Sequence, residues 1–169
     1  VYATMKADSS RRGDPLDLRR QVGSMFNTVF MARNDEPSYV QLPYLVTRGG
    51  FENHFLQQLD RATELALIDL WVLDQREDIN FSNADRQQLQ NALRDYYVSD
   101  YRVSWRDALR NTQLVPLPDI HQAAVVADAL VSAERPLDRL LAAVEQNTRL
   151  YPELPDDDEE AREALQRSP

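Results

Sequence analysis

The 169-residue sequence contains no cysteine, and glycine is scarce, with four residues. Without cysteine the chain cannot form a disulfide, use a thiol as a nucleophile or hold a metal through thiolates. This absence leaves the cellular compartment open, because proteins of oxidising compartments can also lack cysteine. Scarce glycine, together with long stretches free of helix-breaking residues, indicates a helix-rich fold.

Long apolar runs and an excess of basic charge are also missing. No apolar run approaches the roughly 18 residues that a membrane-spanning helix needs, so we expect no transmembrane segment in this chain. The net charge is −9 and the isoelectric point is near 4.7, which argues against nucleic acid as a partner. Residues 156–169 carry six acids and two arginines, and Lys6 is the single lysine of the sequence.

Sequence signatures of catalysis are absent as well. The chain has no G-x-S-x-G, H-E-x-x-H, G-x-G-x-x-G or phosphate-loop motif. His54 and His121 lack acidic or histidine partners at metal-binding spacing. The carboxylate pairs Asp60 with Glu64 and Asp95 with Asp100 fit solvated helix surfaces. We therefore predict no catalytic, cofactor-binding or metal-binding residues.

What the sequence does contain is one long helical pattern over residues 82–111. Ser82 is suited to cap it, with Asp85 three residues further on. Large apolar or aromatic residues recur at every fourth position: Leu89, Leu93, Tyr97, Tyr101, Trp105 and Leu109. A step of four residues drifts by about 40° on a 3.6-residue helix, so this stripe winds around the helix. The pattern predicts a central helix that contacts several neighbours in turn.

Asp100 projects toward the same face of this helix. We interpret it as a tyrosine-bonded or solvated carboxylate, because a catalytic role requires a second polar group that converges on it.

Shorter helical patterns surround the central one. We expect the end of a helix at residues 1–6, a polar loop at 9–13 and helices near 14–32, 47–66, 119–131 and 136–148. Residues 38–46 read as an extended connection, and residues 114–118 as a rigid crossing. The predicted core residues are Phe55, Trp71, Leu93, Tyr97, Tyr101, Trp105, Leu109 and Leu141.

Taken together, the patterns predict an all-α fold, an irregular bundle of six or seven helices. Residues 1–150 would form one helical domain, or two subdomains at 1–78 and 79–150. Residues 151–169 would form an acidic linker or a short terminal helix. Because the chain begins at Val1 without an initiator methionine, we expect it to be a piece of a longer protein.

Three segments carry a resemblance to a known family. They are YLVTRGGFENHFLQQLD at 44–60, YYVSDYRVSWRDAL at 96–109 and RPLDRLLAAVEQNTRL at 135–150. This series resembles the periplasmic region of the IcmF-type (TssM) inner-membrane core proteins of bacterial type VI secretion. The likeness covers roughly residues 1–150.

The resemblance implies a structural, non-catalytic role in the trans-envelope core complex of a Gram-negative bacterium. It places the chain in the periplasm, as part of an inner-membrane-anchored protein. It implies self-association in a ring, and contact with the outer-membrane lipoprotein TssJ mainly through a more C-terminal region. Two alternatives stay open: a helical adapter that binds another envelope protein, and a periplasmic glycan hydrolase with two carboxyl groups about 5–10 Å apart.

Overall fold

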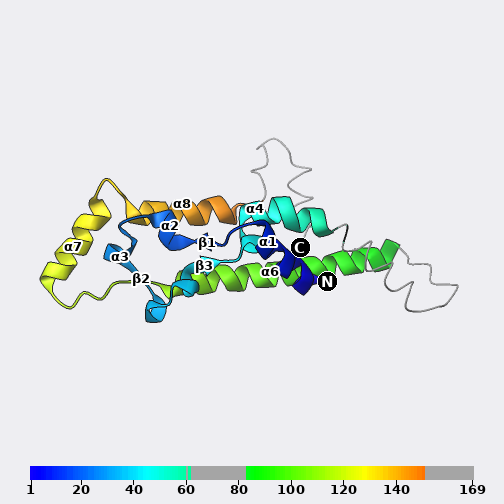
Figure 1. Cartoon of the computed structure of the whole chain (residues 1–169), viewed down its shortest axis with the longest axis horizontal. Coiled ribbons are helices and arrows are strands. Elements are labelled where there is room, and N and C mark those ends of the chain that lie inside the picture. Colours follow the sequence, from blue (N-terminus) through cyan, green and yellow to red (C-terminus); the bar gives the residue numbers. More distant parts are fainter. Residues whose placement is uncertain (60, 62–82, 151–169) are drawn as a thin grey trace, which may run out of the picture.

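The computed structural model describes residues 1–59, 61 and 83–150. These residues form a mainly helical molecule with two small two-stranded sheets, so the predicted all-α class is confirmed in its main character. In Figure 1, α6 runs along the lower side of the molecule, α8 lies on the opposite side with α2 and β1 between them, and α7 lies at one end. The predictions for Trp71, for the cap at Ser82 and for residues 151–169 lie outside the described residues.

The elements follow one another in short steps. The helices are α1 (Tyr2–Arg12), α2 (Leu18–Val22), α3 (Phe26–Val29), α4 (Arg48–Gly50), the π-helical turn η4 (Phe51–Phe55), α6 (Asn83–Asn111), α7 (Ile120–Val131) and α8 (Pro136–Thr148). Three 3-10 turns are η1 (Arg33–Asp35), η2 (Pro37–Val40) and η3 (Tyr44–Val46). The strands are β1 (Leu16–Asp17), β2 (Phe30–Ala32), β3 (Gln41–Leu42) and β4 (Thr112–Leu114).

The long helix α6 spans 29 residues, as the four-residue stripe predicts. Its buried side chains are Leu93, Tyr97, Trp105 and Ala108, and Tyr101 is half-buried between them. The neighbours change along the helix: α1, η3, η2, β3 and β4 each contact α6. This succession of partners is what a winding stripe produces.

Two predicted core residues are exposed. Leu109 of α6 is 38% exposed, because the drift of the stripe carries it out of the seam and Ala108 occupies the buried position. Leu141 of α8 is 57% exposed, since the neighbouring Leu140 takes the inward place. Successive helical residues are about 100° apart, so a run of leucines does not reveal by itself which one faces the core.

The predicted helix over residues 14–32 is wrong. Asp14 and Pro15 precede the short strand β1, and α2 begins only after Asp17, whose carboxylate accepts a hydrogen bond from the Arg19 backbone N–H. Gly23, with a φ of 89°, ends α2. The residues of β2 leave the helical path because they pair antiparallel with β4, some 80 residues further along the chain. A partner so distant in sequence is invisible to local periodicity.

Two smaller predictions are also corrected. Residues 9–12 continue α1 rather than forming a loop, and the chain leaves the helix at Gly13. Residues 38–46 contain the 3-10 turns η2 and η3 around the two-residue strand β3, which pairs antiparallel with β1.

The predicted helix starts are confirmed where caps are present. The Thr47 hydroxyl accepts a hydrogen bond from the Gly50 N–H at 3.1 Å and begins α4. The Asp119 carboxylate accepts one from Gln122 N–H at 2.8 Å and begins α7. Pro136 occupies the first turn of α8.

The core consists of two buried clusters joined at Tyr101. One cluster gathers α2, α3, β2, α7 and α8 around Trp105, and the other gathers α1, η4 and α6 around Phe55 and Tyr97. Tyr101 packs against both. Each cluster combines residues from the first 60 positions with residues after position 90. The division into subdomains at 1–78 and 79–150 stays a prediction.

Candidate interaction surface

The polar tips of three α6 aromatic residues hold other segments in place. The Tyr97 hydroxyl donates to the Leu45 carbonyl at 3.3 Å, and Trp105 Nε1–H donates to the Val46 carbonyl at 2.9 Å. The Tyr101 hydroxyl donates to the Asn147 carbonyl at the end of α8, at 3.4 Å. We call Tyr97, Tyr101 and Trp105 the aromatic ladder. It joins α6 to η3 and to α8 through buried area and hydrogen bonds together.

Burial also changes the acidity of the ladder. It raises the pKa of Tyr101 to about 12. The hydroxyl therefore stays neutral, and stays a hydrogen-bond donor, well above neutral pH. The aromatic contacts extend beyond the ladder, because the ring of Tyr97 stacks on Phe55 with the ring centroids 4.2 Å apart.

Asp100 binds α1, as the interpretation of a tyrosine-bonded carboxylate predicts. Its two oxygens accept hydrogen bonds from the Tyr2 hydroxyl at 3.0 Å and from Lys6 Nζ at 2.7 Å. Burial first, and then the Asp100 charge and the hydrogen bond to it, raise the pKa of Tyr2 above its ordinary value. The ring of Tyr2 also stacks on Tyr96, with centroids 6.1 Å apart. Asp100 thus holds α1 against α6.

A second buried carboxylate, Asp17, organises the turn between β1 and α2. It accepts hydrogen bonds from the backbone and side chain of Arg19, the shortest at 2.6 Å, and from Gln41 at 3.3 Å. Burial alone would raise the pKa of Asp17, but these hydrogen bonds and the Arg19 charge together lower it. Its oxygens are therefore occupied in holding the β1–β3 corner together. The sequence analysis did not single out Asp17 in this role.

The histidines and carboxylate pairs considered from the sequence do not assemble into a site. His54 is buried, with Nε2 3.1 Å from the Met5 carbonyl, whereas His121 is exposed on α7. Asp100 faces α1, whereas Asp95 lies in a shallow groove on the solvent side of α6. Asp60 and Glu64 lie outside the described residues. Within the described ranges, no group of three or more histidine, aspartate or glutamate residues is placed to hold a metal ion.

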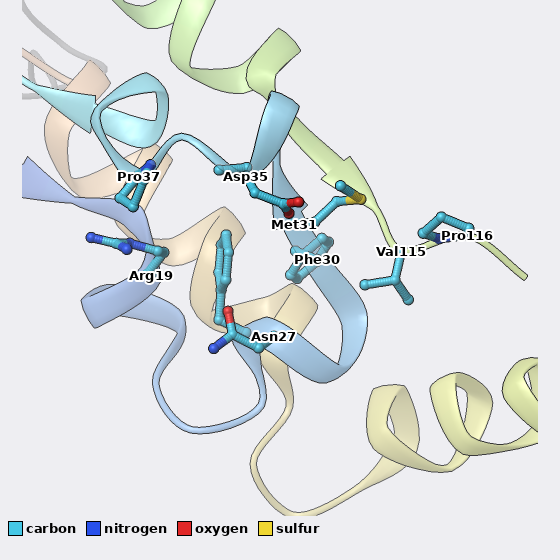
Figure 2. Close-up of a pocket in the computed structure, with 10 residues that line it drawn as sticks. Arg19, Asn27, Phe30, Met31, Asp35, Pro37, Val115 and Pro116 are labelled. Atoms are coloured by element: carbon cyan, nitrogen blue, oxygen red, sulfur yellow. The ribbon is translucent and has the colours of Figure 1, made fainter.

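An open groove of about 510 Å³ lies between η1, β2 and the chain that leaves β4. Figure 2 shows Arg19, Asn27 and Asp35 around it, with Phe30 and Val115 among its apolar walls. Asp35 is the one carboxylate among the described residues that line it. A glycosidase needs two such groups across the bond that it cleaves. The groove therefore does not favour the glycan hydrolase alternative.

The helix α7 presents an exposed apolar side. Ile120 and Val131 lie near the two ends of α7 on the same side of the helix, and they are 81% and 84% exposed. Val125, about 120–140° around the helix from them, is 50% exposed. On the neighbouring helix α8, Leu137 and Leu141 are also exposed. We call these five residues the α7 surface. An exposed apolar surface of this kind marks protein contact sites more often than isolated apolar residues do.

This surface was missed from the sequence, because Leu141 was expected in the core and the pattern over residues 119–131 was interpreted only as a helix. The sequence signal that could have revealed it is the excess of apolar residues in this helix. Residues 120–131 are apolar on more sides than one helix seam can bury. None of the described helices has the length and apolar content needed to cross a bilayer.

Comparisons with known proteins match the chain to one family. The profile of the family described as "IcmF-related: Intracellular multiplication and human macrophage-killing" matches residues 1–149. The Type VI secretion system component TssM1 of Pseudomonas aeruginosa PAO1 is 32% identical over 123 residues. That alignment covers 72% of this chain and 11% of the relative, so the chain spans a small part of the relative's length. No solved structure matches the chain.

Proposed function

Because the chain belongs to the IcmF-related family, we propose that it is a non-catalytic structural module of the membrane complex of a type VI secretion system. In this proposal the module lies in the periplasm, as part of an inner-membrane-anchored protein of a Gram-negative bacterium. Its partners are other subunits of the complex, including further copies in a ring. The outer-membrane lipoprotein TssJ would be contacted mainly through a region outside this chain.

The observation that carries the proposal is the aromatic ladder of α6. Three of the largest side chains of the chain bind backbone carbonyls, and Asp100 binds α1, so these groups are committed to holding the fold. A catalytic site would need a nucleophile, base or metal ligand that converges with a second group on a free space. In this proposal the described residues serve instead as a rigid strut.

The α7 surface supports a second, overlapping function as a helical adapter. A strut transmits position only where its ends contact neighbours, and the exposed apolar residues of α7 lie at one end of the molecule (Figure 1). In this version another subunit of the secretion complex packs on Ile120 and Val131. Burial of such side chains stabilises an interface by roughly 1.5–3 kcal/mol each.

The proposal is tested by placing a charge on the α7 surface. The variant I120E/V131E in the full-length protein should fold normally, because both side chains are already exposed. It should lose co-purification with the other subunits of the complex, since a desolvated glutamate is costly in an interface. The control is H121E, which adds one glutamate at an exposed polar position of α7, whereas I120E/V131E adds two.

Thermal unfolding of the purified variants separates folding from assembly. We expect both variants to melt like the parent protein and only I120E/V131E to lose its partners. If I120E/V131E assembles and supports secretion as well as H121E does, the α7 surface is not an interface. An adapter function through α7 is then excluded, and the module must contact its neighbours elsewhere.

A further inference from the structure

We propose that the solvent-facing side of α6 binds an acidic amphipathic helix of a partner protein. The inference rests on the proposed function and names the kind of partner that one face of the strut receives. It concerns a surface separate from the α7 surface.

The binding face is a shallow groove along α6 of about 270 Å³. It is lined by Asp95, Val98, Ser99, Arg102, Val103 and Arg106. Val98 and Val103 are 45% and 42% exposed, and they flank the row of polar lining residues on its two sides. On a 3.6-residue helix these positions fall on one side, away from the aromatic ladder.

Three arginines follow the groove at intervals of four residues. Arg102, Arg106 and Arg110 are all exposed and lie on consecutive turns of the same face. Within the described part of the chain, no carboxylate lies in ion-pair distance of Arg102 or Arg110. Arg106 Nε reaches Asp107 Oδ1 at 3.9 Å, the longest ion pair among the described residues. Like charges at this spacing repel one another, so the arrangement does not serve the stability of α6 itself.

The sign of this face is opposite to that of the chain. The groove and its extension to Arg110 hold three arginines and two aspartates, Asp95 and Asp107, which gives a charge of +1, whereas the whole chain carries −9. A nucleic acid would be repelled by the rest of the molecule, whereas an acidic protein segment can be short enough to meet the arginines alone. Charge complementarity therefore selects a segment rich in aspartate or glutamate.

The side chains also specify the form of the partner. Guanidinium groups bind carboxylates through paired hydrogen bonds, and their four-residue spacing matches carboxylates on successive turns of a facing helix. The valines on the two sides of the arginine row require apolar side chains on the two sides of those carboxylates. From Asp95 to Arg110 the face extends over about 22 Å, which suits a helix of roughly four turns. The partner is thus an amphipathic helix whose row of acids is flanked by apolar side chains.

The test uses a photo-crosslinking amino acid in place of Ser99, in the full-length protein expressed in its own bacterium. Crosslinked peptides are identified by mass spectrometry, in the parent and in the R102E/R106E variant. The matched control is R86E/R94E, which changes the same charge at exposed positions of α6 outside the groove. We expect a crosslink to an acidic helical peptide of another subunit. Its yield should fall about tenfold or more in R102E/R106E and stay near the parent value in R86E/R94E.

A compensating change makes the result specific. Lysine in place of the crosslinked acids of the partner should restore the yield in R102E/R106E. The proposal is overturned by a crosslink to a peptide without acids, by a crosslink to residues 156–163 of this chain, by equal losses in the two variants, or by no crosslink in an assembled complex. Co-purification of the complex, measured in the same cells, reports on the proposed function separately, because the α7 surface is unchanged in every variant.

Discussion

Trp105 shows how a single residue can serve packing and polarity at once. Its ring is buried between α6 and the α2–α3 layer, and its Nε1–H meets the Val46 carbonyl at 2.9 Å. Trp105→Phe keeps most of the buried area but leaves that carbonyl unpaired, which should cost about 1–3 kcal/mol in the free energy of unfolding. Trp105→Ala removes both and should cost about 3–5 kcal/mol.

Urea unfolding of the two variants measures this difference. Equal costs for Trp105→Phe and Trp105→Ala would show that the hydrogen bond, and not the ring, is what matters at this position. A melt of Trp105→Ala that matches the parent would show that the ring is exposed.

The ion pair of Asp17 makes the stability of the fold depend on pH. Its pKa is lowered in the folded state, despite burial, by Arg19 and Gln41. The ionised carboxylate therefore stabilises the fold at pH values above the unfolded pKa of about 3.9, and this contribution is lost as the pH falls through the folded value. Asp17→Asn can still cap α2 but cannot pair with Arg19, so it should be less stable than the parent at pH 7.

Unfolding measured from pH 7 down to pH 3 shows whether the stabilisation by Asp17 is lost as the pH falls. The stability gap between the parent and Asp17→Asn should narrow below about pH 4 as Asp17 becomes protonated. Asp17→Ala, which also loses the cap, should stay less stable throughout. A gap that widens toward low pH would contradict the assignment of Arg19 as the partner of an ionised Asp17.

At the scale of elements, the glycine pair before η4 gives a matched experiment. A Cβ at Gly50 would overlap the backbone carbonyl of Tyr44, whereas a Cβ at Gly49 would make ordinary contacts no closer than 3.7 Å. Gly50→Ala should therefore destabilise the fold by about 1–3 kcal/mol, through displacement of η3. Gly49→Ala should be neutral, or stabilising by up to about 1 kcal/mol. Thermal unfolding of both variants tests whether the close approach of the Tyr44 backbone is the reason for a glycine at position 50. Equal losses of stability in the two variants would contradict this explanation.

The elements also show what sequence could and could not predict. The helix α6 could be predicted because its apolar residues repeat over about six turns without a helix breaker. The helices α7 and α8 could be predicted from Asp119 and Pro136 at their starts. The strands β2 and β4 could not be predicted from the sequence, because each three-residue strand gains its hydrogen bonds from a partner far along the chain. Likewise the ladder residues could be named as core, but the carbonyls that they bind depend on where η3 folds back.

At the scale of the whole molecule, the acidic residues 156–169 give a prediction that no described contact tests. Leu165 is their only large apolar side chain, so they offer little surface to bury. A chain that ends at Pro155 should keep the melting temperature of the 169-residue chain. Its circular dichroism should show no loss of helical signal beyond that of the removed residues. A loss of helical signal beyond that of the removed residues would show that they dock on the fold.

The central claim is that the molecule acts by position and not by catalysis. The most direct measurement scores secretion and complex assembly together in full-length proteins that carry Asp60→Asn, Glu64→Gln, Asp95→Asn or Asp100→Asn, one at a time. We expect secretion to follow assembly in every variant, with Asp100→Asn the most affected, because Tyr2 and Lys6 lose the charged partner that holds α1 on α6. A variant that assembles a stable, complete complex and yet abolishes secretion would contradict the account.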